Sequence, residues 1–201
     1  MKKLLFLVSY LFHPIFIPIM GTLLYFWLGN SYLAVEQVYL VVIQVSIIMV
    51  FIPICFFYLL RTMGKVSSIM LHDVAQRKLP LAIQIVLTAL LLAKSVTADV
   101  LPELYHFFFG GMVSSALALM LALVRIKASL HQMGMAALWV FTIGLSVHSQ
   151  TNALYLVAAL TFLNGIVAAS RLQMEAHTGK ELLIGGLCGL LPQLVIWPYW
   201  L

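Results

Sequence analysis

The last polar segment of the chain combines residue types that suit phosphate chemistry. It reads SRLQMEAHTGKE, residues 170–181, and contains Arg171 as a cation, His177 as a nucleophile or proton carrier, and Glu181 after the histidine. If residues 177–181 are helical, His177 and Glu181 lie on one face of the helix. A carboxylate that holds one ring nitrogen of a histidine leaves the other nitrogen free to attack. The spacing therefore predicts an activated histidine beside a cation.

Two further polar segments add to this chemistry. They are LHDVAQRKLP, residues 71–80, and RIKASLHQMG, residues 125–134. Together the three segments offer a set of cations: Arg77, Lys78, Arg125, Lys127 and Arg171. Such a set suits phosphate, which arginine binds in a bidentate manner, and His131 could protonate a leaving alkoxide. Neither paired carboxylates nor Cys and His at metal-ligand spacing occur, so the residues indicate metal-free phosphoryl transfer through a phosphohistidine.

The elements that carry these segments are expected to be membrane-spanning helices. The chain has 201 residues, 64% of them hydrophobic and only 8% charged, whereas about a quarter of the residues of soluble chains are charged. The apolar runs are long enough for helices to cross roughly 30 Å of hydrocarbon, and the alternating pattern of a β-barrel is absent. We therefore predict an all-α, polytopic transmembrane bundle of six to seven spans, at residues 4–28, 37–60, 80–98, 104–124, 132–148, 152–169 and 182–200.

The three polar segments are expected at one surface of the membrane, because two spans separate each segment from the next. All Lys and Arg residues except Lys94 fall at the N-terminus or after an even-numbered span, and the positive-inside rule places that surface in the cytoplasm. The start, MKKLLFLVSYLF, continues into a longer apolar run without a small-residue cleavage site, so we predict a retained first span. Pro14, Pro18 and Pro53 predict kinks in the first two spans.

Other residues and function classes carry less weight. Cys55 and Cys188 lie in apolar runs and are interpreted as small hydrophobic residues, and His13, His106 and His148 are expected away from the polar surface in packing roles. The net charge of +5 is not arranged as a basic stripe, which argues against a nucleic-acid partner. The last span lacks the lysine that a retinal protein needs, and the paired Asp clusters of Mg²⁺-dependent prenyl transferases are absent.

The motif spacing resembles the type 2 phosphatidic acid phosphatase superfamily. Its members carry the motifs Lys-x6-Arg-Pro, Pro-Ser-Gly-His and Ser-Arg-x5-His-x3-Asp. The segment from Ser170 to Glu181 reads Ser-Arg-x5-His-x3-Glu, and KASLH keeps Ser129 and His131 at the spacing of the second motif. QRKLP retains basic residues before a proline, as in the first motif. The resemblance covers residues 72–186 of a single integral-membrane domain that we place at residues 1–201.

The resemblance implies a role for each matching residue. His177 would be the nucleophile, Glu181 its orienting partner and His131 the general acid. The phosphate would be bound by the residues of the three motifs, Arg77, Ser129, Ser170 and Arg171. Lys78 and Lys127 join this binding set by charge and position. The expected activity is hydrolysis of a lipid phosphate or an isoprenyl (pyro)phosphate in a bacterial cytoplasmic membrane, with no metal or other cofactor.

A second interpretation stays open beside this one. Glu181 stands where the family has Asp, and the first motif lacks its lysine. A protein of the same fold that has lost turnover, and that binds or transports an anionic lipid, would fit these departures.

Overall fold

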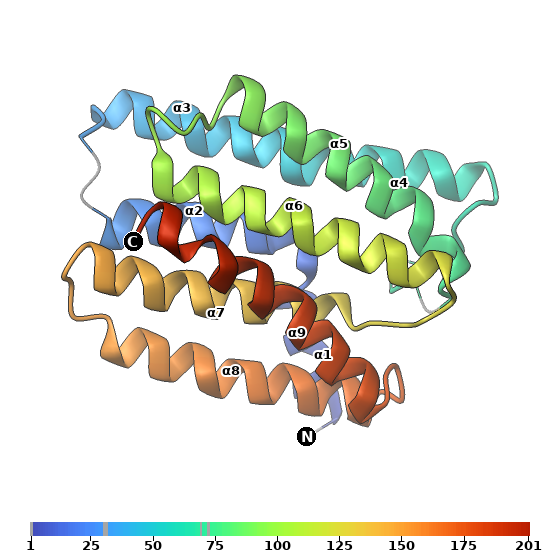
Figure 1. Cartoon of the computed structure of the whole chain (residues 1–201). Helices are drawn as coiled ribbons and strands as arrows, with labels where there is room; N and C mark the ends of the chain where they lie inside the picture. The colour runs from blue at the N-terminus through green and yellow to red at the C-terminus, as the bar shows by residue number, and fades with distance from the viewer. Residues whose placement is uncertain (1, 30–31, 69, 72) are drawn as a thin grey trace.

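The computed structural model describes residues 2–29, 32–68, 70–71 and 73–201, and within them the chain is helical, with no strand. The α-helices are α1 (Lys2–Leu11), α2 (Ile17–Leu28), α3 (Val35–Ser46), α4 (Ile52–Thr62), α5 (Lys78–Lys94), α6 (Pro102–Leu123), α7 (Leu130–His148), α8 (Leu154–Gln173) and α9 (Gly179–Ile196). Figure 1 shows them as one bundle of roughly aligned rods.

The helices confirm the predicted class of an integral, multi-pass membrane protein. In the described part of the chain, 7 stretches are long and apolar enough to cross a membrane: Leu5–Leu28, Val35–Thr62, Ala75–Lys94, Pro102–Leu123, Leu130–His148, Leu154–Gln173 and Gly179–Tyr199. Each overlaps one predicted span. Because the number of spans is odd, the two termini lie at opposite ends of the bundle, as Figure 1 shows.

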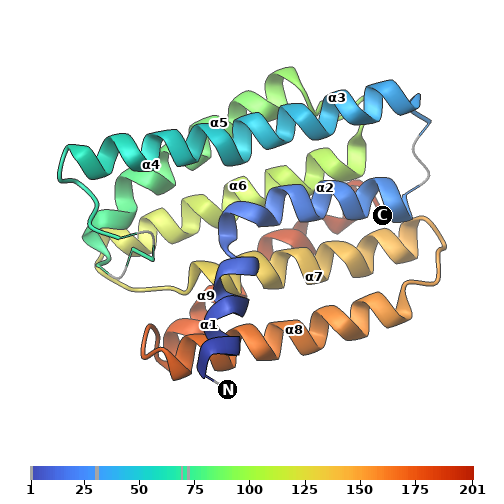
Figure 2. The ribbon, with the colours of Figure 1, turned by 180° about the vertical axis from the view of Figure 1, so that it is seen from behind.

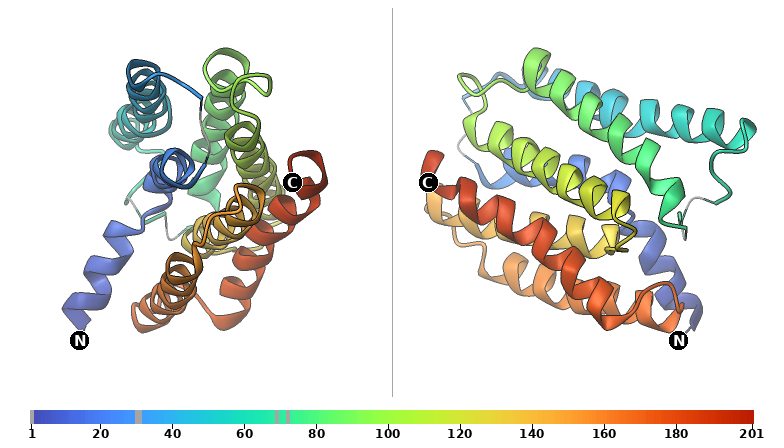
Figure 3. Two further views of the ribbon diagram at one scale, coloured as in Figure 1. Left: turned by 90° about the vertical axis from the view of Figure 1, so that its left-hand side faces the viewer. Right: turned by 45° about the vertical axis from the view of Figure 1, so that its right-hand side comes forward.

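The first two spans are interrupted near their prolines, as the sequence predicts. In the first span the 3-10 turn η1 (Pro14–Phe16) separates α1 from α2, and Pro18 lies in the first turn of α2. In the second, the π-helical turn η2 (Ile47–Phe51) joins α3 to α4 and Pro53 follows it. Proline cannot donate the backbone hydrogen bond that a continuous α-helix needs. The first break lets α1 leave the line of α2 and reach α8, as Figures 2 and 3 show.

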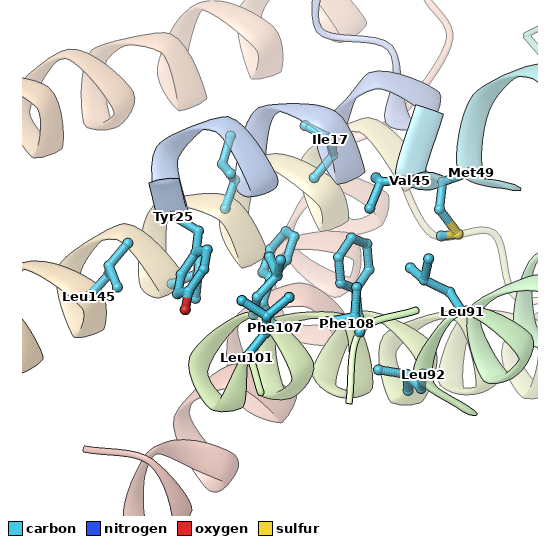
Figure 4. Packing of buried hydrophobic residues seen from close by; sticks show 14 of the residues in the cluster. Ile17, Tyr25, Val45, Met49, Leu91, Leu92, Leu101, Phe107, Phe108 and Leu145 are labelled. Carbon is cyan, nitrogen blue, oxygen red and sulfur yellow. The ribbon is translucent and has the colours of Figure 1, made fainter. Parts of the chain in front are cut away.

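Helix α7 is the centre of the bundle. Its most apolar stretch is 67% buried, whereas that of α8 is 22% buried, and α7 packs against α2, α6, α8 and α9. On one side of α7 the main hydrophobic core joins α2, α3, η2, α5 and α6 through residues such as Tyr25, Val45, Leu91 and Phe108 (Figure 4). Because α7 is enclosed by its neighbours, its first turn is held in a fixed position. The second polar segment, residues 125–134, leads into that turn.

Two glycines bring α9 against the start of α7. A Cβ on Gly185 would overlap with the carbonyl oxygen of Ser129, and a Cβ on Gly189 with that of Met133. The absence of side chains at these positions lets the two backbones approach closely, as small residues do in membrane helix pairs. The N-terminus of α9 is thereby fixed beside the N-terminus of α7.

The three polar segments lie at the same end of the bundle. They connect α4 to α5, α6 to α7, and α8 to α9, and Figure 1 shows these connections at the end opposite the C-terminus. The start of α1 reaches the same end. The fold therefore places the three segments at one end of the bundle, where they can form one site.

Candidate active site

Hydrogen bonds join the three polar segments into one cluster, which we call the polar cluster; it comprises Arg77, Lys127, Ser129, His131, Ser170, Arg171, His177 and Glu181. The Arg77 side chain donates from Nη1 to the carbonyl of Ala128 at 2.6 Å. Lys127 Nζ donates to the carbonyl of Ala176 at 2.7 Å. The backbone N–H of Ser129 donates to the carbonyl of Glu181 at 3.0 Å. Each segment is thus bonded to at least one of the other two.

The centre of the polar cluster is a histidine–carboxylate pair. His177 Nδ1 lies 2.7 Å from Glu181 Oε2. Because a carboxylate only accepts hydrogen bonds, the proton of the neutral imidazole sits on Nδ1. The other ring nitrogen, Nε2, then keeps its lone pair and can act as a nucleophile or base.

The sequence suggested that His177 and Glu181 share one face of a helix, but the structure brings them together in a different way. Helix α9 begins at Gly179, and His177 precedes its N-cap residue, Thr178. The Thr178 hydroxyl accepts from the Glu181 N–H, and Glu181 Oε2 accepts from the Thr178 N–H, each at 3.4 Å. This reciprocal arrangement is a capping box, in which a Glu at the third helical position reaches back across the helix start. From there the same carboxylate reaches His177.

Burial and nearby cations keep His177 in its neutral form. Desolvation first, and then the charges of Arg77, Lys127 and Arg171, lower the pKa of His177 from 6.5 to about 4, although the hydrogen bond to Glu181 opposes the shift. The Lys127 ammonium also lies 3.6 Å from Glu181 Oε2. At neutral pH the imidazole is therefore uncharged and suited to nucleophilic attack.

Two arginines of the polar cluster are buried without a carboxylate partner. Arg77 is 4% exposed and Arg171 is 1% exposed, and neither forms an ion pair with the described acidic residues. Arg77 bonds to two carbonyls, those of Leu71 and Ala128. Arg171 donates from Nη1 to the Ser9 hydroxyl at 3.1 Å, and its Nε has no hydrogen-bond partner among the residues that the structure describes. A buried, unpaired cation is costly, so an anion beside these guanidiniums would be stabilised.

Helix α1 covers the polar cluster. His131 Nε2 donates to the Ser9 carbonyl at 3.1 Å. The Ser170 hydroxyl lies 2.7 Å from the Ser9 hydroxyl and 2.5 Å from the carbonyl of Leu5. His13, which the sequence analysis placed away from this surface, has its ring centre 5.2 Å from that of His131. That expectation was wrong because the chain turns at Pro14 and carries the end of α1 across the start of α7.

Other residues of the three polar segments have structural roles or lie apart from the cluster. The buried Ser129 hydroxyl accepts from the Gln132 N–H at 3.4 Å and caps α7. Lys78 begins α5 and is partly exposed, and its side chain forms no hydrogen bond or ion pair with another described residue. Asp73 accepts from the Ala75 N–H in the loop, and His72 lies outside the described residues.

Sequence reasoning missed Ser9, His13 and Thr178. Thr178 and Glu181 match the Ser/Thr-x-x-Glu pattern of a capping box, so that signal was available in the sequence. Ser9 and His13 reach the cluster only because α1 folds back toward α8, and nothing in their local sequence marks this contact. Among the residues that the structure describes, no three His, Cys, Asp or Glu side chains group closely enough to hold a metal ion. Comparison of the chain with known protein families, characterised proteins and solved structures finds no match.

Proposed function

We propose that the chain is a membrane phosphatase that hydrolyses a lipid phosphate or isoprenyl (pyro)phosphate through a phosphohistidine. The observation that carries the proposal is a neutral His177, oriented by Glu181, in the field of Arg77, Lys127 and Arg171. Three cations and one carboxylate leave a net charge of +2 around the imidazole. A phosphoryl group carries about −1.5 to −2 at neutral pH, so the charge of the site complements it.

The proposed reaction has two steps. His177 Nε2 attacks the phosphorus atom, the bond between phosphorus and the lipid oxygen breaks, and the leaving oxygen takes a proton from His131, which the bound phosphate would hold in its imidazolium form. Water then attacks the phosphohistidine, inorganic phosphate leaves, and the proton of the water restores His131. The buried guanidiniums stabilise the charge that develops on the phosphoryl oxygens. The spacing Ser-Arg-x5-His-x3-Glu, which resembles the type 2 phosphatidic acid phosphatases, supports these assignments.

The site is proposed to face the cytoplasm of a bacterial cytoplasmic membrane. The support is the gathering of nearly all Lys and Arg residues at the end of the bundle that carries the polar cluster. The lipid would stay in the bilayer while its phosphate enters the polar cluster.

Phosphate release tests the proposal directly. Purified protein would be assayed with phosphatidic acid, farnesyl phosphate, farnesyl diphosphate and alkyl phosphates, beside His177→Ala. His106→Ala is the matched control, because His106 bonds to its own helix at Pro102 near the opposite end of the bundle. We expect release by the wild type and the control and none by His177→Ala, with radiolabelled phosphate retained on His177 after rapid quenching. Full release by His177→Ala would contradict the mechanism.

A second candidate, a protein that binds or transports an anionic lipid without turnover, is favoured by one observation. Ser9 of α1 contacts His131, Ser170 and Arg171, so α1 covers this part of the proposed anion site. This candidate predicts that lipid phosphates raise the melting temperature of the protein while no phosphate is released from any of them.

A further inference from the structure

An apolar cavity of about 420 Å³ lies beside the polar cluster. Helices α4, α5, α6 and α7 line it together with the turns η1 and η2. Its volume lies in the range of about 300–1,000 Å³ that is typical of small-molecule sites. In a membrane protein, an apolar cavity of this size suits hydrocarbon.

The cavity runs along the helices from the polar end toward the middle of the bundle. Its lining extends from Pro80 to Thr88 on α5 and from Leu60 to Met49 on α4 and η2. At 1.5 Å per residue these distances are roughly 12 Å and 16 Å. Half of the hydrocarbon core of a bilayer is about 15 Å, so the cavity is about as deep as one leaflet.

The deep end of the cavity meets the packed core of the bundle. The deep end is lined by Met49, Phe107 and Phe108, which belong to the packed core in Figure 4.

Two residues belong to both the cavity and the surroundings of the polar cluster. Leu71 lines the cavity, and its carbonyl accepts from Arg77 Nε at 2.7 Å. His13 lines the cavity, and its ring packs edge-on against His131. A ligand with its phosphate among these cations would therefore have the cavity directly beside its remaining part.

We propose that this cavity holds a hydrocarbon chain of the phosphorylated lipid and limits its length, so that the preferred substrate carries a linear chain that spans about one leaflet. This inference rests on the proposed function only in taking the polar cluster as the phosphate site. Each buried methylene contributes about fourfold to affinity. Affinity should therefore rise with chain length until the chain reaches Phe107 and Phe108 at the deep end of the cavity, and then stop rising.

Gly111 allows a precise test. It lines the cavity one turn from Phe107 and Phe108, and a Cβ there would meet no atom of a described residue within 4 Å. Gly111→Leu should therefore fill the deep part of the cavity without displacing its neighbours. Gly165→Leu is the matched control, because Gly165 is an exposed glycine of α8 whose Cβ also meets nothing within 4 Å. Gly111→Ala is a smaller change for use if the leucine variant does not fold.

The experiment compares octyl, dodecyl, hexadecyl and eicosyl phosphate in two measurements, the kcat/KM of phosphate release and the rise in melting temperature. We expect Gly111→Leu to lower kcat/KM for hexadecyl phosphate by about tenfold or more and to change kcat/KM for octyl phosphate by less than about twofold. Hexadecyl phosphate should no longer raise the melting temperature of this variant. Gly165→Leu should match the wild type.

Two outcomes would overturn the inference: the same effect of Gly111→Leu at every chain length, or equal stabilisation by hexadecanol and hexadecyl phosphate. If hexadecyl phosphate stabilises the wild type but not Gly111→Leu, and no chain length releases phosphate, the cavity assignment holds and the proposed hydrolysis fails.

Discussion

Glu181 contacts His177 at 2.7 Å across the start of α9, although only Glu181 belongs to that helix. Its carboxylate closes the capping box with Thr178, orients the imidazole, and lies 3.6 Å from Lys127. The start of α9 and the orientation of the candidate nucleophile therefore depend on one side chain. The additional methylene of Glu, compared with the Asp of the resembling family, suits this arrangement, because a capping box needs a side chain that reaches back over the first turn.

Shortening Glu181 should lower turnover more than it lowers stability. In Glu181→Asp the carboxylate is one methylene shorter and no longer reaches both Thr178 and His177 Nδ1, so the imidazole is misplaced. A misplacement of about 1 Å costs about a hundredfold in rate, and we expect kcat for phosphate release to fall by about tenfold to a hundredfold with a smaller change in KM. Glu181→Gln keeps the length of the side chain and serves as the comparison. Wild-type kcat in Glu181→Asp would show that the carboxylate does not orient His177.

The acid limit of activity should lie well below the ordinary titration range of histidine. Because desolvation first, and then the neighbouring cations, lower the pKa of His177 to about 4, the nucleophile stays neutral as pH falls through 6.5. We expect kcat/KM to fall as the pH is lowered through about 4. In Lys127→Met, which removes one of those cations, this fall should occur at a higher pH. If kcat/KM falls at the same pH in Lys127→Met as in the wild type, His177 is not the group that sets the acid limit.

The same shift has a consequence for stability. The unfolded imidazole titrates near 6.5, whereas the pKa of the folded one is lowered to about 4. Between these values the unfolded chain binds more protons, so the free energy of unfolding decreases as pH falls from about 6.5 toward 4. His177→Ala should flatten that part of the pH dependence.

The fold was predictable from the sequence because the bilayer allows few alternatives. Long apolar runs must become helices that satisfy their own hydrogen bonds, and the polar breaks between them mark where each helix ends. The charges then place the segments 71–80, 125–134 and 170–181 at one end. The hydrogen bonds from Arg77 to Ala128 and from Lys127 to Ala176 now join those segments.

The details of the site were less predictable because they depend on tertiary packing. The sequence suggested a helical face for His177 and Glu181, whereas the contact runs through the capping box of α9. The contact of Ser9 with Arg171 depends on the path of α1 after the break at Pro14. Such contacts follow from how helices approach each other, which local periodicity does not encode.

Because α9 lies so close to α7, we expect alanine substitutions at two glycines of α9, Gly186 and Gly189, to affect stability differently. In Gly189→Ala the new Cβ would overlap with the Met133 carbonyl, whereas in Gly186→Ala it would meet only Gln132 Cγ, at 3.7 Å. Backbone cannot move aside as a side chain can, so Gly189→Ala should destabilise the protein by about 1–3 kcal/mol. Gly186→Ala should change stability little. Thermal unfolding in detergent measures both, and equal melting temperatures would show that α9 does not hold α7 at this distance.

Ser9 should compete with the anion for the buried arginine. Its hydroxyl accepts from Arg171 Nη1 at 3.1 Å and lies 2.7 Å from the Ser170 hydroxyl, where an anionic oxygen would otherwise bind. Ser9→Ala removes this acceptor and leaves the guanidinium available to the anion. Since a hydrogen bond contributes about 1 kcal/mol net, the inhibition constant of vanadate should fall by about fivefold.

The matched control for this prediction is Ser46→Ala. Among the described residues the Ser46 hydroxyl bonds only within its own helix, to the Val42 carbonyl at 2.6 Å, so its loss should leave the inhibition constant unchanged. A rise in the inhibition constant for Ser9→Ala would assign the opposite role to this residue. Ser9 would then be a ligand of the anion, and α1 would be a wall of the phosphate site rather than its cover.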